Sequence, residues 1–273
     1  MLRTTFPVTL MVIARNEAAS IGRCLDSVPF AAEKVVVDSG SEDGTQQIAA
    51  AHGARVVQHE WLGFGPQRNF AATQASHDWI LVLDADEALT PQLAEELQRR
   101  LPDLLQSSMA GAVLRRRTWY MGAPMRWYRP MVGERLVRLY HRGRGRWSNA
   151  RVHETLQLDG QATELREPFE HHHNPTLVHR QLKILRYSEL KARDWLDRGR
   201  PVRLWAAPLV FIAAFIKDYF FRLAFLDGWR GYVVAQVGAS YAVYKRLRYF
   251  EMKHNPASRE LAAQLLHQYG LDP

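Results

Sequence analysis

One stretch decides the predicted fold class: residues 79–87, which read WILVLDADE. The apolar run from Trp79 to Leu83 is typical of a strand buried on both faces of a sheet. Two carboxylates, Asp84 and Asp86, follow the run directly. Ligands of parallel sheets bind beyond the carboxyl ends of the strands. This position therefore predicts a binding site more strongly than an Asp-x-Asp pair in an ordinary turn does.

The chain before this stretch alternates strand and helix patterns. Apolar, β-rich runs cover residues 8–14, 34–38 and 54–58, and helical patterns cover about 17–27, 44–52 and 66–76. Such alternation indicates right-handed βαβ units around a mostly parallel sheet that is covered on both faces. We therefore expect an α/β fold, with a Rossmann-like sheet and flanking helices.

The pattern changes after a helix predicted over residues 91–105. Two strands are expected at 111–121 and 134–141, and helices from His179 onward, with a break at Gly199-Arg200-Pro201. We expect one catalytic domain over 1–178, made of a nucleotide-binding half (1–105) and an acceptor-binding half (106–178). An amphipathic helical extension would cover 179–273.

Composition excludes several classes of protein. The chain has 273 residues, of which 47% are hydrophobic and 11% aromatic, so it is not disordered. A single cysteine, Cys24, excludes a disulfide framework and a cysteine-built zinc site. The first residues hold no apolar stretch of signal-peptide length, so we do not expect export.

Charge is distributed unevenly along the chain. Residues 1–105 hold 8 Lys and Arg against 14 Asp and Glu, a net of −6, whereas residues 106–273 hold 28 against 14, a net of +14. An acidic half followed by a basic half predicts a cation or nucleotide site beside a surface that meets anions. A solvated basic face is the simpler alternative.

A stretch of 13 uncharged residues, 204–216, is shorter than the roughly 20 that a membrane span requires. Continued to Leu226, it is aromatic, sparsely charged and flanked by Arg and Lys, which is typical of a segment in the membrane interface. A buried C-terminal helix remains the alternative. The basic charge of this half favours an anionic membrane surface.

The carboxylates suggest metal chemistry. Asp84 and Asp86 are hard oxygen ligands that suit Mg²⁺ or Mn²⁺ shared with a diphosphate. Asp38 ends another predicted strand and precedes Ser39-Gly40-Ser41-Glu42-Asp43-Gly44-Thr45, which lacks the P-loop and the dinucleotide signatures. The Asp38 carboxylate can accept hydrogen bonds from a nucleobase edge, or it can cap a turn.

Together these segments resemble a known family. The order and spacing of Ala14-Arg15-Asn16-Glu17, Val37 to Thr45, Gln67-Arg68-Asn69 and Asp84-Ala85-Asp86-Glu87 are similar to those of family 2 glycosyltransferases of the GT-A fold. Three later segments resemble the bacterial lipopolysaccharide-core β-glucosyltransferases of the WaaE/KdtX-like branch. They are Arg151-Val152-His153-Glu154, Arg186-Tyr187-Ser188 and Phe225-Leu226-Asp227-Gly228.

The resemblance implies a UDP-sugar donor, a divalent metal and inversion at the anomeric carbon. It also implies roles for single residues. Ala14, Arg15, Asn16, Glu17, Asp38 and Ser39 would hold the uridine, Arg68 would face the diphosphate, Asp84 would lie near the ribose or the metal, and Asp86 would bind the metal.

The sequence identifies the catalytic base less clearly than the donor and metal residues. Members of the superfamily usually carry it in a later Glu-Asp pair, which this chain lacks after the metal motif. Glu154 is the nearest candidate, and His153 either hydrogen-bonds it or is itself the base.

Two further groups of residues invite interpretation. Three consecutive histidines, His171 to His173, either form a strand-end or loop cluster near the donor phosphates or are an inert surface run. Arginines mixed with aromatic residues predict a basic acceptor surface, and the same mixture can bind RNA. They are Arg115, Arg116, Arg117, Arg126, Arg129, Arg135, Arg138, Arg142, Arg144 and Arg146 with Trp119, Tyr120, Trp127, Tyr128 and Trp147.

The expected function is transfer of a hexose, with glucose as the expected sugar, to the lipopolysaccharide inner core or a related lipid-linked glycan. The enzyme would be cytoplasmic and peripheral on the inner membrane of a Gram-negative bacterium, with no nucleic acid partner. Two alternatives remain: a polyprenyl-phosphate acceptor, or a protein that binds a sugar nucleotide or RNA without catalysis.

Overall fold

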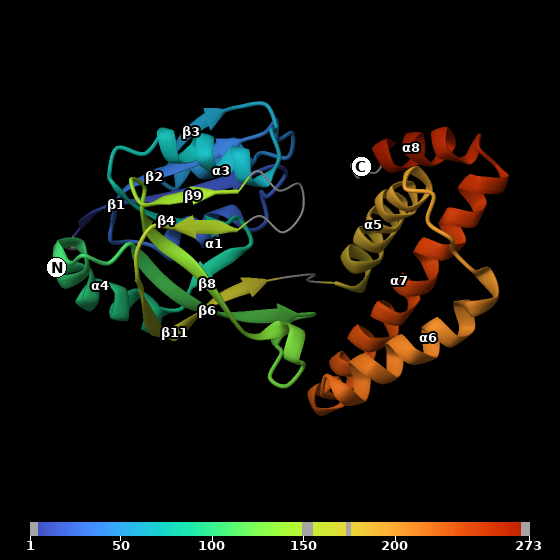
Figure 1. The fold of residues 1–273 in the computed structure, drawn as a ribbon. Helices are drawn as coiled ribbons and strands as arrows, with labels where there is room; N and C mark the ends of the chain where they lie inside the picture. The colour runs from blue at the N-terminus through green and yellow to red at the C-terminus, as the bar shows by residue number, and fades with distance from the viewer. Residues whose placement is uncertain (1–4, 149–154, 173–175, 269–273) are drawn as a thin grey trace. The chain divides into compact units, whose positions relative to one another are not determined.

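The computed structural model describes residues 5–148, 155–172 and 176–268 (Figure 1). The chain divides into two compact units, which are described separately. Unit 1 comprises residues 1–117 and 133–172, and unit 2 comprises residues 118–132 and 173–273. The predicted boundary at residue 178 stays a prediction.

Unit 1 is built on a mixed sheet with the strand order β3-β2-β1-β4-β8-β6-β11-β5. Its strands are β1 (Phe6–Ala14), β2 (Ala31–Asp38), β3 (Arg55–Gln58), β4 (Trp79–Asp84), β5 (Glu87–Leu89), β6 (Gly111–Tyr120), β8 (Val132–His141) and β11 (Ala162–His172). Strands β3, β2, β1 and β4 are parallel, and β8 runs antiparallel to β4. A separate hairpin pairs β9 (Gly145–Trp147) with β10 (Leu156–Leu158).

Helices alternate with the first four strands, as predicted. They are α1 (Ile21–Asp26), α2 (Thr45–Ala51), α3 (Phe64–Thr73) and α4 (Pro91–Gln106). This order, the mostly parallel first half of the sheet and the flanking helices confirm the predicted α/β class (Figure 1).

Both faces of the sheet are covered, which explains the continuous apolar runs. In β1, Leu10 and Val12 belong to one hydrophobic cluster, while Met11 and Ile13 belong to a second one. All four side chains are buried. A strand that packs on both sides cannot show polar–apolar alternation.

Strand register brings three strand ends to one edge of the sheet. Ala14 at the end of β1 pairs with Asp38 of β2, and Ile13 pairs with Asp84 of β4. The polar residues that follow these strands therefore begin from neighbouring points, which fixes where a site can form.

Strand β11 was not predicted from the sequence. Its segment, ATELREPFEHH, contains one arginine and three glutamates, and only Leu165 and Phe169 within it are fully buried. The charged residues obscure the apolar period of two on which recognition of a half-buried strand depends.

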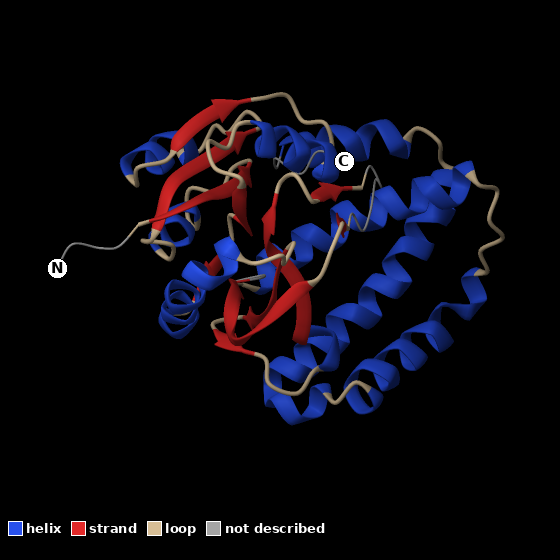
Figure 2. Cartoon of the chain, turned by 60° about the vertical axis from the view of Figure 1, so that its left-hand side comes forward, coloured by secondary structure: helices blue, strands red, loops and turns tan. Residues whose placement is uncertain are grey.

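Unit 2 is mainly helical, as expected for the C-terminal region (Figure 2). Its helices are α5 (Leu177–Asp197), η2 (Leu204–Ala206), α6 (Ala207–Ile216), η3 (Lys217–Phe221), η4 (Ala224–Asp227), α7 (Gly228–His254) and α8 (Ser258–Gln268). Residues 118–132 add the end of β6, the short strand β7 (Ala123–Pro124) and the turn η1 (Arg129–Met131). Helix α5 ends just before the predicted break at Gly199.

The apolar helical segment of unit 2 is longer than the 13 uncharged residues counted in the sequence, and it is exposed. Leu204–Phe221 is 18 residues of helix with a mean hydropathy of 1.6, so by length and composition alone it is long enough to cross a membrane. The uncharged run ends at Ile216, but the helix continues through Lys217 and Asp218 to Phe221, which makes it longer than the uncharged run. Only 11% of this segment is buried, so the alternative of a buried C-terminal helix is wrong.

Close backbone contact joins α7 to η4. A Cβ atom on Gly231 would lie 1.6 Å from the carbonyl oxygen of Ala224, so no larger residue fits without a shift of the backbone. Gly238, two turns further along α7, would meet only the carboxylate of Asp218, at 3.1 Å.

We predict that Gly231→Ala lowers the stability of unit 2, by about 1–3 kcal/mol or more, because overpacking outweighs the gain in helix propensity. Gly238→Ala is the matched control, since the Asp218 side chain can move aside. Thermal unfolding followed by circular dichroism measures both. A Gly231→Ala protein as stable as the control would contradict the close approach.

Candidate functional site

The loops after β1 and β2 are bonded to each other. The backbone N–H of Asn16 donates to Ser41 Oγ (2.8 Å), and the backbone N–H of Glu42 donates to Asn16 Oδ1 (2.9 Å). Glu17 N–H donates to Thr45 Oγ1 at 2.8 Å. Asn16 adopts a left-handed backbone (φ 57°), which asparagine tolerates better than most residues. The Ala14–Glu17 segment is therefore held rigidly on the turn that follows Asp38.

Asp38 organises that turn. Its side chain is completely buried, and Oδ1 accepts hydrogen bonds from the backbone N–H groups of Gly40 (3.1 Å) and Ser41 (2.9 Å) and from Gln46 Nε2 (2.7 Å). The hydroxyl of Ser41 donates to Oδ2. The structure therefore places Asp38 as a turn-capping residue, and its contact with a nucleobase stays a prediction.

Three consecutive residues of α3 reach three different elements. Gln67 Nε2 donates to Ser39 Oγ after β2 (3.0 Å), and Arg68 Nη2 donates to Asp84 Oδ1 at the end of β4 (2.6 Å). The Asn69 amide donates to the carbonyl of Trp147 in β9 (2.9 Å) and accepts from its N–H (3.0 Å). Neighbouring residues of a helix point about 100° apart, so one short segment can connect several elements.

Asp84 belongs to a buried network of charges. Arg138 Nη2 from β8 lies 3.1 Å from Asp84 Oδ2 and also bonds Glu87. The Glu87 side chain is fully buried, those of Arg68 and Arg138 are 5% exposed, and that of Asp84 is 32% exposed. The predicted place of Arg138 on an exposed acceptor surface is therefore wrong.

The network shifts the proton affinity of its members. Burial alone would raise the pKa of Asp84, but the charges of Arg68 and Arg138 hold this pKa well below its usual range. Burial raises the pKa of Glu87 to about 7, against the opposing charge of Arg138. Burial disfavours the charged guanidinium of Arg138 as well, but Glu87 and Asp84 raise its pKa above the usual value. Asp84 is therefore held as a carboxylate.

Asp86 lies beside a histidine that comes from a distant part of the chain. His171 Nε2 on β11 is 3.2 Å from Asp86 Oδ2, and their side chains are 13% and 26% exposed. The backbone N–H of His172 donates to the Asp86 carbonyl at 2.9 Å. The interpretation of these two histidines as an inert surface run is therefore wrong, while His173 lies outside the described residues.

Within the described ranges, no group of three or more His, Cys, Asp or Glu side chains is arranged to hold a metal ion. Asp86 nevertheless offers a carboxylate, the ligand type that suits Mg²⁺ or Mn²⁺, and the imidazole of His171 lies beside it as a nitrogen donor. A cation held by these two side chains would complete its coordination with water or phosphate oxygens.

The structure thus brings the predicted site residues into three groups: residues 14–17 with the turn at 38–45, Arg68 with Asp84, and Asp86 with His171. The predicted base candidates, His153 and Glu154, lie outside the described residues. Sequence reasoning assigned no separate role to Glu87, offered His171 a place near the donor phosphates only as one of two alternatives, and placed Trp147 on the acceptor surface. The acidic motif and the histidine run were signals for the first two.

The predicted basic and aromatic acceptor surface is largely buried or paired. Tyr120, Tyr128 and Trp147 are buried, although Trp127 is 53% exposed. The three arginines at 115–117 form ion pairs with Glu164, Glu134 and Glu170, respectively. Charged residues that pair with each other contribute little to a field that attracts anions.

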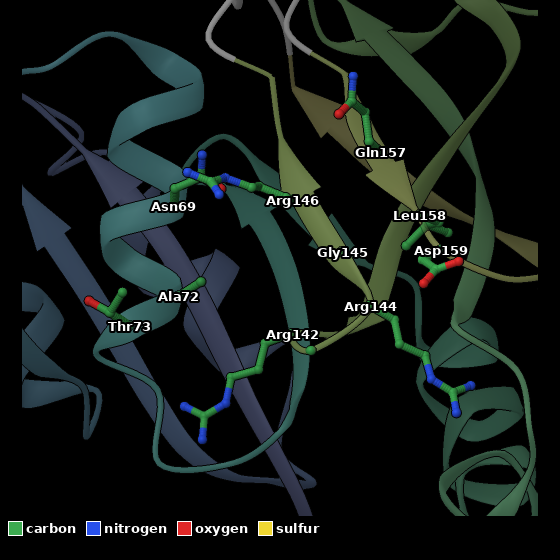
Figure 3. Close-up of a pocket in the computed structure, with 11 residues that line it drawn as sticks. Asn69, Ala72, Thr73, Arg142, Arg144, Gly145, Arg146, Gln157, Leu158 and Asp159 are labelled. Atoms are coloured by element: carbon green, nitrogen blue, oxygen red, sulfur yellow. The ribbon is translucent and has the colours of Figure 1, made fainter.

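A cavity of about 910 Å³ lies between α3 and the β9–β10 hairpin (Figure 3). Asn69, Ala72 and Thr73 line it from α3, and three arginines, at 142, 144 and 146, lie along its other side. In Figure 3 the guanidinium groups of Arg142 and Arg144 point in different directions. Arg142 bonds Asp78 and the Ala75 carbonyl. These arginines therefore do not converge on one anion.

Comparison with known proteins agrees with this architecture. The model of the family described as Glycosyl transferase family 2 matches residues 9–141. The chain is 35% identical over 252 residues to the lipopolysaccharide core biosynthesis glycosyltransferase LpsC of Rhizobium meliloti, covering 86% of this chain and 89% of that protein. It is 28% identical to an uncharacterized glycosyltransferase of Rickettsia bellii, over 98% and 96% of the two chains.

Among solved structures, the chain is similar to glucosyl-3-phosphoglycerate synthase from Mycobacterium tuberculosis in complex with Mn²⁺, UDP and glucosyl-3-phosphoglycerate. The identity is 27%, the coverage is 44% of this chain and 45% of that chain, and the TM-score is 0.33.

Unit 1 has an α/β fold, and acidic loops that are hydrogen-bonded to each other lie at the carboxyl edge of its sheet. Together with the sequence matches, these features define an enzyme that transfers sugars. The chain belongs to glycosyltransferase family 2.

We predict that Arg138→Met destabilises unit 1 by about 3–5 kcal/mol, because Glu87 and Asp84 would lose a buried cationic partner. Arg135→Met on the same strand is the control: its side chain is 60% exposed, so we expect a change of about 0–1 kcal/mol. Denaturant unfolding measures both. If Arg138→Met and Arg135→Met changed the free energy of unfolding by the same amount, the buried charge network would not be stabilising.

A second substitution tests the link between α3 and β9. Asn69→Ala removes both hydrogen bonds to the Trp147 backbone, so we expect a loss of about 1–3 kcal/mol together with lower transfer activity. Thr73→Ala, at an exposed position on the same helix, should change stability by less than about 0.5 kcal/mol. Thermal unfolding measures the stability of both variants, and a transfer assay measures their activity. An Asn69→Ala enzyme with unchanged stability and activity would contradict a stabilising link between α3 and β9.

Proposed function

We propose that this enzyme transfers a hexose, with glucose as the expected sugar, from a UDP-sugar to the lipopolysaccharide inner core or a related lipid-linked glycan. The similarity to LpsC over most of both chains supports this acceptor class. Its place of action would be the cytoplasmic face of the inner membrane of a Gram-negative bacterium. The single observation that carries the chemistry is the Asp86–His171 pair at the carboxyl edge of the sheet.

Asp86 and His171 would hold a divalent cation, Mg²⁺ or Mn²⁺, and Asp84 would contribute indirectly. Both carboxylate oxygens of Asp84 already bond arginines, so its role near the ribose or metal would be to set the local charge. When bound, such a cation neutralises charge that develops on the departing UDP.

Arg68 would face the diphosphate from a fixed position. Its guanidinium bonds Asp84 and also lies 4.7 Å from the ring centroid of Trp147, so its orientation is set before the donor arrives. A pre-positioned positive charge stabilises a transition state without the cost of reorganisation.

The uridine would be held by the interlocked loops, residues 14–17 with Asp38 and Ser39. Asp38 would act by shaping the turn, since its carboxylate is already bonded there. Arg15 and Asn16 are exposed and would meet the nucleoside directly.

Transfer with inversion would be one in-line displacement. The acceptor hydroxyl oxygen bonds to the anomeric carbon as the bond from that carbon to the UDP oxygen breaks. The acceptor proton passes to a base, for which Glu154 is the first candidate and His153 the second.

We predict that Asp86→Asn reduces metal-dependent transfer at least about 100-fold while the protein stays folded, because a bound metal supplies several kcal/mol of transition-state stabilisation. Asp78→Asn is the control, since this carboxylate is 59% exposed and forms an ion pair with Arg142. Steady-state assays with UDP-glucose and Mn²⁺, together with calorimetric titration of UDP with and without Mn²⁺, measure the effect.

His171→Ala should weaken the Mn²⁺ dependence of UDP binding and leave metal-free binding of UDP unchanged. Full transfer activity in a folded Asp86→Asn protein would refute the proposed function, as would an absence of UDP binding by the unmodified enzyme.

A further inference from the structure

Unit 2 exposes an apolar surface of a kind that soluble proteins normally bury. Along α6 and the turns that follow it, large side chains face outward; we call this surface the α6 face. Its residues include Leu209, Ile212, Ile216, Phe220, Phe225 and Trp229, each at least 40% exposed. Contiguous apolar patches of this kind mark sites of interaction with proteins or membranes.

The packing of α6 explains why its apolar side faces outward. Within α6, every residue of which the structure describes, only Ala207 is buried. On the side of α6 that faces α7, the ring of Phe215 contacts that of Tyr232 (5.8 Å between centroids), although Tyr232 is itself 51% exposed, and the side chain of Asp218 is buried. Folding of unit 2 therefore leaves the outer stripe of α6 exposed.

Charge distinguishes this unit from unit 1. Unit 2 holds 18 Lys and Arg against 8 Asp and Glu, a net of +10, whereas unit 1 holds 18 against 20, a net of −2. The net positive charge of the protein thus comes from the unit that carries the α6 face. An anionic partner would be attracted to this unit and not to unit 1.

Cations lie next to the apolar residues in a fixed arrangement. The Asp227 carboxylate accepts hydrogen bonds from the backbone N–H groups of Arg126 (2.8 Å), Trp127 (3.1 Å) and Tyr128 (2.8 Å). The N–H of Arg129 donates to the Arg222 carbonyl at 3.0 Å. The exposed side chains of Arg126, Trp127 and Arg129 are thereby held beside the turns that continue α6.

We propose that the α6 face, with the Arg126–Arg129 loop at its border, docks on the surface of an anionic phospholipid bilayer. The aromatic and aliphatic side chains would enter the boundary between headgroups and acyl chains, and the arginines would contact lipid phosphates. This inference deepens the proposed function, on which it rests for the membrane setting, by naming the surface that holds the enzyme there.

The geometry favours a helix that lies in the interface over one that spans the bilayer. Lys217, Asp218 and Arg222 fall within or next to the apolar segment, and its packing partner α7 carries Arg230 near the same end. A spanning arrangement would draw these charges towards the hydrocarbon core, which is costly. An interfacial arrangement leaves them at headgroup level.

Co-sedimentation of the full-length enzyme with vesicles tests the proposal. We expect at least about tenfold stronger partitioning to a phosphatidylcholine–phosphatidylglycerol mixture than to phosphatidylcholine alone, weakened by salt. The triple variant Ile212→Ser, Phe220→Ser and Phe225→Ser should lose at least about tenfold in binding to the mixed vesicles. Arg126→Gln with Arg129→Gln should remove most of the preference for the anionic lipid.

A matched control is available in the same unit. Leu261 and Leu265 of α8 are 59% and 48% exposed but lie outside the α6 face, so Leu261→Ser with Leu265→Ser should bind vesicles as the unmodified enzyme does. Circular dichroism checks the folding of every variant. UDP binding in the presence of Mn²⁺, measured in parallel, should be the same in all of them, so that a failure of docking is distinguished from a failure of the proposed function.

Four results would overturn the proposal. One is equal binding to both kinds of vesicle, and another is unchanged binding by the triple variant. Resistance of the native membrane-bound enzyme to alkaline carbonate extraction would indicate a spanning helix instead. Conversion of a dimer to a monomer by the triple variant, without an effect on vesicle binding, would show that the α6 face covers a second copy of the chain.

Discussion

The site depends on one constraint: two arginines and two carboxylates meet at the end of β4, where three of the four side chains are buried and Asp84 is partly exposed. Removing charges from water is costly, and the cost is recovered only if each charge meets an opposite one with good hydrogen-bond geometry. Arg68, Arg138, Asp84 and Glu87 satisfy this condition jointly. Because they come from α3, β8, β4 and β5, the condition can be met only in the folded arrangement of these four elements.

That arrangement has consequences for the surrounding loops. Gln67 and Asn69, on either side of Arg68, bond the turn after β2 and the backbone of β9. The position of Arg68 is thus tied to that of Ser39 and Trp147. Preorganised charge of this kind is what an enzyme needs when a diphosphate leaves, since the protein does not have to reorganise as charge develops.

The two units differ in how they treat apolar surface. In unit 1 both faces of the sheet are covered, and its apolar strands are buried almost completely. In unit 2 the most apolar helix, α6, lies at the surface among an excess of cations. A fold that buries its core in one unit and exposes apolar side chains in the other is consistent with an enzyme that takes one substrate from water and another from a membrane.

The amino-acid sequence by itself determined the first four strands and their helices, because continuous apolar runs between helical segments have few other solutions. It also determined the family, since its acidic and glycine-containing segments follow one another in the order and spacing that are typical of family 2 glycosyltransferases. Strand β11 was missed, because its apolar residues are separated by charges that only tertiary ion pairs explain. The partners of Arg138 and His171 were decided by the tertiary structure alone: a side chain's burial and its opposite charge depend on elements that are distant along the chain and adjacent only after the sheet has formed.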